Sequence, residues 1–276
     1  MEKQEGKKKR RTGIRTNLYG CRRRCRNEAS GTGRYGQKIT LCDGIEVRFN
    51  DVGHLLGSAS IEVWITEGDV SKKVVFSGDV GNVNQPIIKD PQLVKEADYL
   101  VIESTYGDRT HGEDIPDYVE EFIKDLRETF QKGGNVVIPS FAVGRTQEIL
   151  YFIREIKEKN LLPEFPGFEV YVDSPLAIEA TNVFNKNVKG CFDEEAMELV
   201  NQGINPLLFR GLKTTITSDE SRQINFDYKT ESYPVCIRYV RSRTDPASFE
   251  AQSVASGMHD LFCGISGSRN AWKKTD

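Results

Sequence analysis

The segment Ile45–Phe49 reads Ile-Glu-Val-Arg-Phe and alternates strictly between apolar and charged side chains. Because successive side chains of a strand point to opposite faces, this pattern predicts a strand that buries Ile45, Val47 and Phe49 and turns its charges to water. Short β-rich runs with Gly and Asp at their breaks make up this region, at residues 37–42, 45–52, 59–66 and 72–77. We predict an antiparallel meander here.

The pattern changes after the apolar run at residues 99–103. Apolar side chains recur at helical spacing from residue 116 to residue 132, and Gly133-Gly134 ends the helix that they predict. Beyond it we predict strands at 135–140 and 169–173, and helices at 146–160, 176–188 and 194–202. Alternating strands and helices indicate parallel strands joined by crossover helices. The predicted fold class is therefore α/β, with a β-rich layer first and a parallel α/β unit second.

The 276 residues are 38% hydrophobic and 29% charged, which is typical of a globular protein and excludes collagen-like and fully disordered chains. No apolar run reaches the roughly 18 residues of a membrane helix. The basic residues 3–11 are not followed by the apolar stretch of a signal peptide. We expect a cytoplasmic protein with no membrane partner. The six cysteines are too few and too scattered for a disulfide framework, so we interpret them as free thiols.

Charge divides the chain into three parts. Residues 1–35 hold 12 Lys and Arg against 3 Glu, residues 36–232 hold 20 against 34 acidic residues, and residues 233–276 hold 6 against 4. The first part is either a basic arm for nucleic acid or an unstructured or non-native segment, and we favour the second because it shows no hydrophobic period. The acidic middle part is a poor polyanion binder overall, so any contact with RNA must be local.

Two glycine-bounded loops carry ligand-type side chains at predicted strand ends. His54 lies in the stretch 51–60, and Asp79 lies in the stretch 76–82. An imidazole and a carboxylate at the ends of adjacent strands suit a zinc site, because a rigid sheet aims them while glycines let the backbone turn. Taken alone, each has a plainer interpretation, a surface histidine and a turn-forming aspartate.

Two further regions carry side chains suited to acid–base catalysis or to phosphate binding. Glu103 follows an apolar strand, where acid–base groups tend to lie, although a capping or turn role is the alternative. Ser140 ends a strand and Arg145 opens a helix, an arrangement suited to holding a phosphate. Arg109 is a further candidate cation for RNA. Both arginines are equally compatible with surface salt bridges.

Five sequence motifs together indicate a protein family more specifically than any one of them does: Gly53–Ala59, Phe76–Asp79, Glu103–Gly107, Pro139–Arg145 and Tyr171–Ala177. In their order and spacing, residues 36 to about 232 resemble the metallo-β-lactamase-fold nucleases with an inserted β-CASP domain, most closely the bacterial relatives of the mRNA 3′-end-processing endonuclease. The resemblance implies a partial metallo-β-lactamase αββα sandwich followed by a β-CASP parallel α/β domain.

The resemblance also implies domain boundaries. We expect a basic, disordered or out-of-frame segment at 1–35 and a partial metallo-β-lactamase-fold domain at 36–112. A β-CASP domain at 113–232 and a loosely ordered, out-of-frame tail at 233–276 complete the division.

The family binds two zinc ions and cleaves RNA phosphodiesters with an activated water. Carried over by motif, His54 resembles a metal ligand, Asp79 the carboxylate that bridges the two metals, and Glu103 the acidic residue that supports a catalytic histidine. We therefore take Asp79 and Glu103 as candidate catalytic residues. RNA is the implied partner, with Arg145, Ser140 and Arg109 as candidate contacts.

The three histidines, at 54, 111 and 259, do not form the family's His-x-His-x-Asp-His motif. A catalytic zinc ordinarily takes three protein ligands, whereas His54 and Asp79 supply two. We therefore expect weak or no zinc binding and an inactive chain.

Both ends suggest family sequence translated in the wrong frame. Codons can be chosen for Arg15–Ser30, and for the residues from Cys236 onward, such that translation in a frame displaced by one nucleotide yields an amino-acid sequence that resembles the family. On this hypothesis the basic end, the apparent Cys21/Cys25 pair and His259 did not evolve to bind anything. Sequencing the encoding nucleic acid tests it.

Two other functions remain in view. A non-catalytic RNA-binding or scaffold relative would keep the β-CASP surface without metals. A nucleotide-binding α/β domain is disfavoured, because neither Gly-x-Gly-x-x-Gly nor Gly-x-x-x-x-Gly-Lys occurs. The RNA target, the endonuclease or exonuclease mode and assembly into a homo-oligomer are left open.

Overall fold

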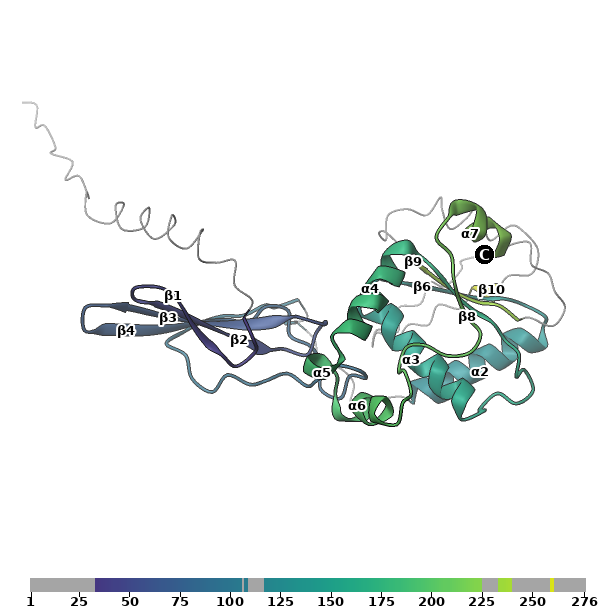
Figure 1. Ribbon diagram of the computed structural model, residues 1–276, viewed down its shortest axis with the longest axis horizontal. Helices are drawn as coiled ribbons and strands as arrows, with labels where there is room; N and C mark the ends of the chain where they lie inside the picture. The colour runs from purple at the N-terminus through teal and green to yellow at the C-terminus, as the bar shows by residue number, and fades with distance from the viewer. Residues whose placement is uncertain (1–32, 106, 109–116, 225–232, 240–258, 261–276) are drawn as a thin grey trace, which may run out of the picture. The chain divides into compact units, whose positions relative to one another are not determined.

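The structure is a computed structural model that describes residues 33–105, 107–108, 117–224, 233–239 and 259–260. The chain divides into two compact units (Figure 1). Unit 1 comprises residues 1–82 and 91–103, and unit 2 comprises residues 83–90 and 104–276. Among the helices within the described ranges, none has the length and apolar character needed to cross a membrane.

Unit 1 is built on a five-stranded sheet in the order β1-β2-β3-β4-β5. The first four strands pair antiparallel with their sequence neighbours, and β5 pairs parallel to β4 at the sheet edge. The predicted meander is therefore confirmed. The strands are β1 Lys38–Cys42, β2 Ile45–Asp51, β3 Ala59–Glu67, β4 Val70–Phe76 and β5 Tyr99–Val101.

One face of this sheet is apolar and only partly covered. The register places Val47 of β2 beside Val63 of β3, and Val63 beside Val74 of β4. Val47 is buried, but every residue of β5 is more than half exposed. Within its described residues, unit 1 contributes a single sheet and no helix to the αββα sandwich that the family resemblance implies.

The opposite face buries a carboxylate. Glu62 is 1% exposed and is bonded by the guanidinium of Arg48, by Lys73 Nζ at 2.5 Å and by Asn50 Nδ2 at 3.1 Å. The pattern of Ile45–Phe49 did not predict this buried carboxylate, which belongs to the neighbouring strand β3. Burial by itself would raise the pKa of this carboxyl, but the hydrogen bonds from Arg48, Lys73 and Asn50 outweigh burial and lower the pKa to about 2.

We predict that Glu62→Gln lowers the free energy of unfolding by about 2 kcal/mol at neutral pH, because it leaves two cations without their buried partner. Since the folded-state pKa lies below the ordinary value of 4.5, the stabilisation is present above that value and is lost as pH falls toward 2. Urea unfolding of both proteins at neutral pH and near pH 3 measures this.

The matched control is Glu46→Gln, on the neighbouring strand β2, where the carboxylate is 40% exposed beside Lys38 at 2.5 Å. It is expected to change stability by less than about 1 kcal/mol. An equal effect of the two substitutions, or an effect of Glu62→Gln that does not shrink with falling pH, contradicts the account.

Unit 2 contains a second five-stranded sheet in the order β10-β6-β9-β7-β8, and all of its pairings are parallel (Figure 1). The predicted parallel α/β unit is confirmed. Its strands are β6 Val136–Ser140, β7 Val170–Asp173, β8 Leu212–Thr214, β9 Val235–Tyr239 and β10 His259–Asp260. Its helices are α2 Tyr118–Gln131, α3 Arg145–Glu158, α4 Pro175–Lys186, α5 Val188–Cys191, α6 Glu194–Asn201 and α7 Ser218–Ile224.

The structure differs from the expectation of loose order after residue 232 at β9 Val235–Tyr239. β9 lies between β6 and β7, and its Val235 and Ile237 are 0% and 1% exposed. Their apolar side chains fill the core of a parallel sheet whose two faces are covered, which is where such short apolar runs belong. The other domain boundaries remain predictions, and residues 1–32, 240–258 and 261–276 lie outside the described part.

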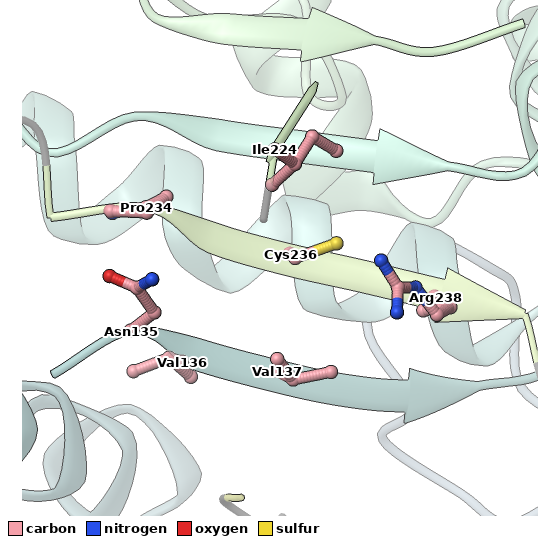
Figure 2. A pocket seen from close by; sticks show the side chains of 7 residues that line it. All are labelled: Asn135, Val136, Val137, Ile224, Pro234, Cys236 and Arg238. Atoms are coloured by element: carbon pink, nitrogen blue, oxygen red, sulfur yellow. The ribbon is translucent and has the colours of Figure 1, made fainter. Parts of the chain in front are cut away.

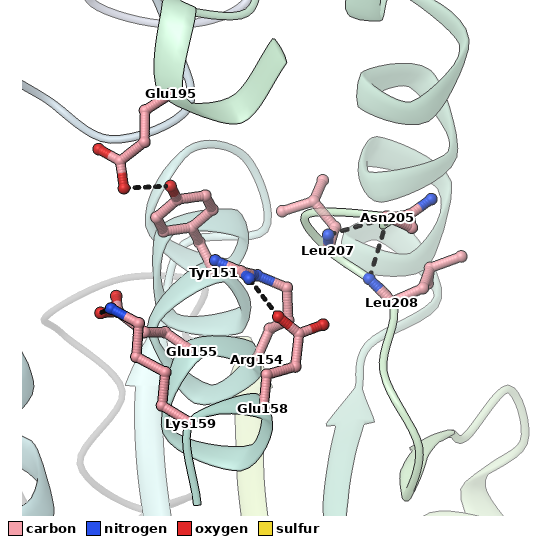
Figure 3. A network of polar contacts seen from close by, with 9 residues as sticks. All are labelled: Tyr151, Arg154, Glu155, Glu158, Lys159, Glu195, Asn205, Leu207 and Leu208. Carbon is pink, nitrogen blue, oxygen red and sulfur yellow. Dashed lines mark hydrogen bonds and ion pairs between the residues drawn. The ribbon is translucent and has the colours of Figure 1, made fainter. Parts of the chain in front are cut away.

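Helix α3 is the most buried helix of unit 2, with Leu150, Ile153 and Ile156 at 1% exposure or less. Figure 3 shows its polar attachments. The hydroxyl of Tyr151 donates to Glu195 Oε1 of α6 at 3.0 Å, and burial raises the pKa of this phenol above its ordinary value. Arg154, only 4% exposed, bonds to Glu158 at 2.5 Å on the next turn. The Tyr151–Glu195 hydrogen bond therefore ties α3 to α6, whereas the Arg154–Glu158 bond lies within α3.

Candidate functional site

His54 lies in the loop between β2 and β3 of unit 1, and its side chain is exposed. Ser58 fixes the loop, because its Oγ accepts from the amides of His54 at 3.3 Å and Leu55 at 3.2 Å. The buried carboxylate of Asp51 accepts from the amide of Gly53 at 3.0 Å. The backbone around the imidazole is thus held by side chains of its own loop.

Asp79 lies in the loop that follows β4, and two glycines press this loop against the His54 loop. A Cβ on Gly78 would lie 2.7 Å from the carbonyl oxygen of Ala59. A Cβ on Gly81 would clash with the carbonyl group of Gly53 and lie 2.7 Å from the amide nitrogen of His54. The amide of Gly81 also donates to Val52 O at 2.8 Å. Only residues without a side chain permit this approach of two backbones.

Glu103 joins the same edge of the sheet from the end of β5. Its Oε1 accepts from the amide of Val80 at 2.5 Å, one residue beyond Asp79, and its own amide donates to Ser77 Oγ at 3.0 Å. Ser77, which is buried, in turn donates its amide to Val101 O at 2.9 Å. The carboxylate of Glu103 therefore anchors the Asp79 loop to β5.

Three predicted site residues of unit 1, His54, Asp79 and Glu103, thus occupy loops that contact one another at one end of the sheet. Across the described ranges, however, no three His, Cys, Asp or Glu side chains come together closely enough to hold a metal ion. His54 and Asp79 offer two donors where a catalytic zinc takes three. The described residues therefore do not by themselves fit a zinc ion, and we assign no reaction step to one.

Unit 2 places two further predicted residues where β6 ends and α3 begins. Ser140 is 6% exposed, and its hydroxyl bonds to that of Thr146 at 2.7 Å. Arg145 is the first residue of α3, and its side chain, 36% exposed, pairs with Glu148 at 2.9 Å. Of the two, Arg145 is the one that solvent reaches. Arg109 lies outside the described residues.

The sequence analysis missed a polar cluster at the carboxyl ends of β7, β8 and β9. The carboxylate of Asp173 accepts from Thr215 Oγ1 at 2.6 Å, Ser221 Oγ at 2.9 Å and Arg238 Nε at 2.8 Å. The side chains of Asp173 and Arg238 are 9% and 19% exposed. Asp173 belongs to the motif Tyr171–Ala177. Its hydrogen-bond partners, however, lie 42 to 65 residues away in the sequence, and no local sequence pattern reveals such contacts.

A pocket at the start of β6 and β9 holds a cysteine, and Figure 2 shows the residues that line it: Asn135, Val136, Val137, Ile224, Pro234, Cys236 and Arg238. Burial raises the pKa of the Cys236 thiol to about 12. Cys236 is 4% exposed, so the pocket is part of the core, and a thiol with so high a pKa is not a nucleophile at neutral pH. Cys42, Cys191 and Cys236, the cysteines of the described residues, are all free thiols.

Comparison with known proteins agrees with this architecture. The family model described as the Beta-Casp domain matches residues 146–258. The match extends through residues 233–258, which are part of the segment interpreted above as out of frame. Sequencing the encoding nucleic acid decides whether these residues are in-frame family sequence or an out-of-frame segment.

Three curated relatives illustrate the similarity. Ribonuclease TTHA0252 of Thermus thermophilus is 36% identical over 191 residues, which are 69% of this chain and 42% of the relative. An RNase J-like protein of Methanocaldococcus jannaschii is 32% identical over 62% of this chain and 39% of the relative. The transcription termination factor FttA of Methanosarcina mazei is 31% identical over 68% of this chain and 29% of the relative.

A β-rich unit followed by a parallel α/β unit with a Beta-Casp match, in a chain whose relatives are named as ribonucleases, supports a hydrolase by family. The Beta-Casp match and the relatives named as ribonucleases support membership of the metallo-β-lactamase-fold, β-CASP family of RNA nucleases. The chain spans less than half the length of the relatives compared here.

We predict that Gly81→Ala separates the His54 and Asp79 loops, because the added methyl group meets backbone atoms that cannot rotate away. The expected destabilisation is about 2–4 kcal/mol. Hydrogen exchange should show faster exchange at the amides of Gly81 and His54, and denaturant unfolding gives the magnitude.

Gly167→Ala is the control, because a Cβ there meets nothing within 4 Å and the backbone is not left-handed. It is expected to change stability by less than about 0.5 kcal/mol. If Gly81→Ala is as well tolerated as this control, the close approach of the two loops is wrong.

Proposed function

We propose that this chain is part of an RNA phosphodiesterase of the β-CASP family, with His54 and Asp79 as metal ligands and Asp79 and Glu103 as its catalytic carboxylates. The single observation that carries the proposal is the backbone contact of Gly81 with Gly53 and His54, since it keeps an imidazole and a carboxylate at one sheet edge. A metal-activated water is the chemistry that such donors serve in phosphodiester hydrolysis.

The role of Glu103 follows from its hydrogen bond to Val80. A carboxylate that fixes the loop of a metal ligand sets the direction of that ligand, as outer partners of metal sites do. In this chain Glu103 therefore positions Asp79. RNA is the proposed substrate, and relatives named as ribonucleases support it.

We further propose that the chain as it stands does not hold zinc tightly and does not cleave RNA. The support is the donor count: His54 and Asp79 bring two ligands, and within the described residues no third comes near enough to complete a group. Zinc is the metal that imidazole and carboxylate donors of this kind suit, although carboxylates also serve other divalent ions.

A second candidate, a non-catalytic RNA-binding or scaffold relative, is favoured by the same donor count. In that case the surface of unit 2, with Arg145 at the start of α3, carries the function. The cytoplasm is the proposed location. Self-association is also proposed, because the apolar residues of the edge strand β5 are more than half exposed.

Elemental analysis and an RNA cleavage assay on the purified chain test the proposal together. We expect less than one zinc ion per chain. We also expect no metal-dependent RNA cleavage, so a chelator should have no effect on single-stranded RNA in the assay. Because two donors bind weakly, His54→Ala and Asp79→Ala should each reduce the residual zinc further, whereas Asp69→Ala, an exposed turn residue between β3 and β4, should not.

Stoichiometric zinc that depends on His54 and Asp79, with chelator-sensitive cleavage, would show that the metal centre is complete and the proposed inactivity wrong. Zinc that none of the three substitutions affects would instead remove His54 and Asp79 from the site.

A further inference from the structure

Exposed apolar side chains of unit 2 gather at the carboxyl edge of its parallel sheet. Of the seven large apolar residues of unit 2 that are exposed in the described part, four lie within three residues after the end of a strand. Phe141 and Val143 follow β6, Leu176 follows β7, and Ile216 follows β8. The carboxyl edge of a parallel sheet is where α/β proteins bind their ligands.

Phe141 is the most exposed of the four, at 69%, although its loop is firmly held. Thr146 Oγ1 donates to the carbonyl of Phe141 at 2.7 Å, and Gln147 Nε2 donates to the carbonyl of Ala142 at 3.2 Å. Gln147 Oε1 also accepts from the amide of Gly144 at 2.7 Å. Thr146 and Gln147 are 1% and 0% exposed.

The exposure of Phe141 is therefore a property of a fixed loop and not of fraying. An aromatic ring has only two side-chain torsions, so a ring on a fixed backbone loses little conformational entropy when a ligand covers it. The loop is built to present this ring to solvent.

Polar groups separate the apolar side chains of this edge. β9 lies between β6 and β7, which places the ends of the latter two strands about 10 Å apart. Arg238 of β9 is held there by Asp173 of β7 at 2.8 Å. Arg145, four residues beyond Phe141, adds a guanidinium that solvent reaches.

Single apolar groups with Arg238 between the ends of β6 and β7, and with Arg145 close to Phe141 in the sequence, are unlike a continuous apolar patch, which would favour a protein partner. It matches the chemistry of a single-stranded nucleic acid, in which bases need π-faces and phosphates need cations. Paired bases in a duplex are already stacked and do not offer their faces.

We propose that Phe141 stacks on an unpaired base of single-stranded RNA while Arg145 contacts the adjacent phosphate. The inference rests on the proposed function, to which it adds a specific base-binding residue on unit 2. It requires no metal ion and no cleavage, so it is independent of the donor count in unit 1.

Fluorescence anisotropy with the full chain tests it, using a labelled oligouridylate of about ten nucleotides and an abasic oligomer with the same phosphates. Phe141→Ala should weaken binding of the oligouridylate about 5- to 100-fold, the usual range for loss of one stacked base. Phe141→Trp should retain binding. Neither variant should change the weaker binding of the abasic oligomer.

The control is Leu208→Ala, which removes a side chain of unit 2 that is 49% exposed and does not follow a strand. It should leave both affinities unchanged. Phe141→Leu keeps apolar area without a π-face and should behave like Phe141→Ala, which also covers the case in which the alanine variant fails to fold.

Three results overturn the inference. If the chain binds oligouridylate and Phe141→Ala and Phe141→Leu bind as tightly, Phe141 does not stack, and the proposed function stands. If both variants lose the abasic oligomer equally, the residue acts on the loop and not on a base. If the unaltered chain binds neither oligomer, the proposed RNA substrate fails as well.

Discussion

The approach of Gly81 to the backbone of Gly53 and His54 is the constraint on which the candidate metal edge depends. It sets the loop after β4 directly against the loop after β2, and the hydrogen bond from Val80 to Glu103 ties both to β5. The first two strand ends are thereby joined through backbone atoms, and the third through the carboxylate of Glu103. Side chains at these positions share one edge because the backbone allows no other arrangement, whatever the occupancy of a metal site.

The sheet beneath this edge has an unusual distribution of polarity. Its charged face buries Glu62 among Arg48, Lys73 and Asn50, while its apolar face ends at β5 with exposed side chains. A buried ion pair is weak support for stability but strongly favours one register, because a slip by one residue would leave the carboxylate without partners. The exposed edge strand has the opposite effect, since it offers unpaired backbone groups to another chain.

Local patterns predicted most of the architecture. The alternation at Ile45–Phe49 and the helical spacing from 116 to 132 correspond to β2 and α2, because each pattern matches the period of the element that it forms. β9 was missed, because Val235–Ile237 is too short an apolar run to distinguish from a loop until β6 and β7 flank it.

The candidate site was predicted by residue type but not by geometry. Ligand-type side chains at strand ends pointed to His54, Asp79 and Glu103. The burial of Ser140, the partners of Asp173 and the role of Gly81 depend on contacts between residues distant in sequence, which a local pattern does not contain. Exposed Phe141 likewise gives no sequence signal, because an apolar residue after a strand reads as part of the core.

A nuclear Overhauser effect between the α-protons of Gly81 and the amide proton of His54 tests the central contact most directly. The account predicts a strong cross-peak, since one α-hydrogen of Gly81 lies in the direction in which a Cβ would be only 2.7 Å from the His54 nitrogen. A spectrum in which both residues are assigned and no such cross-peak appears would contradict it.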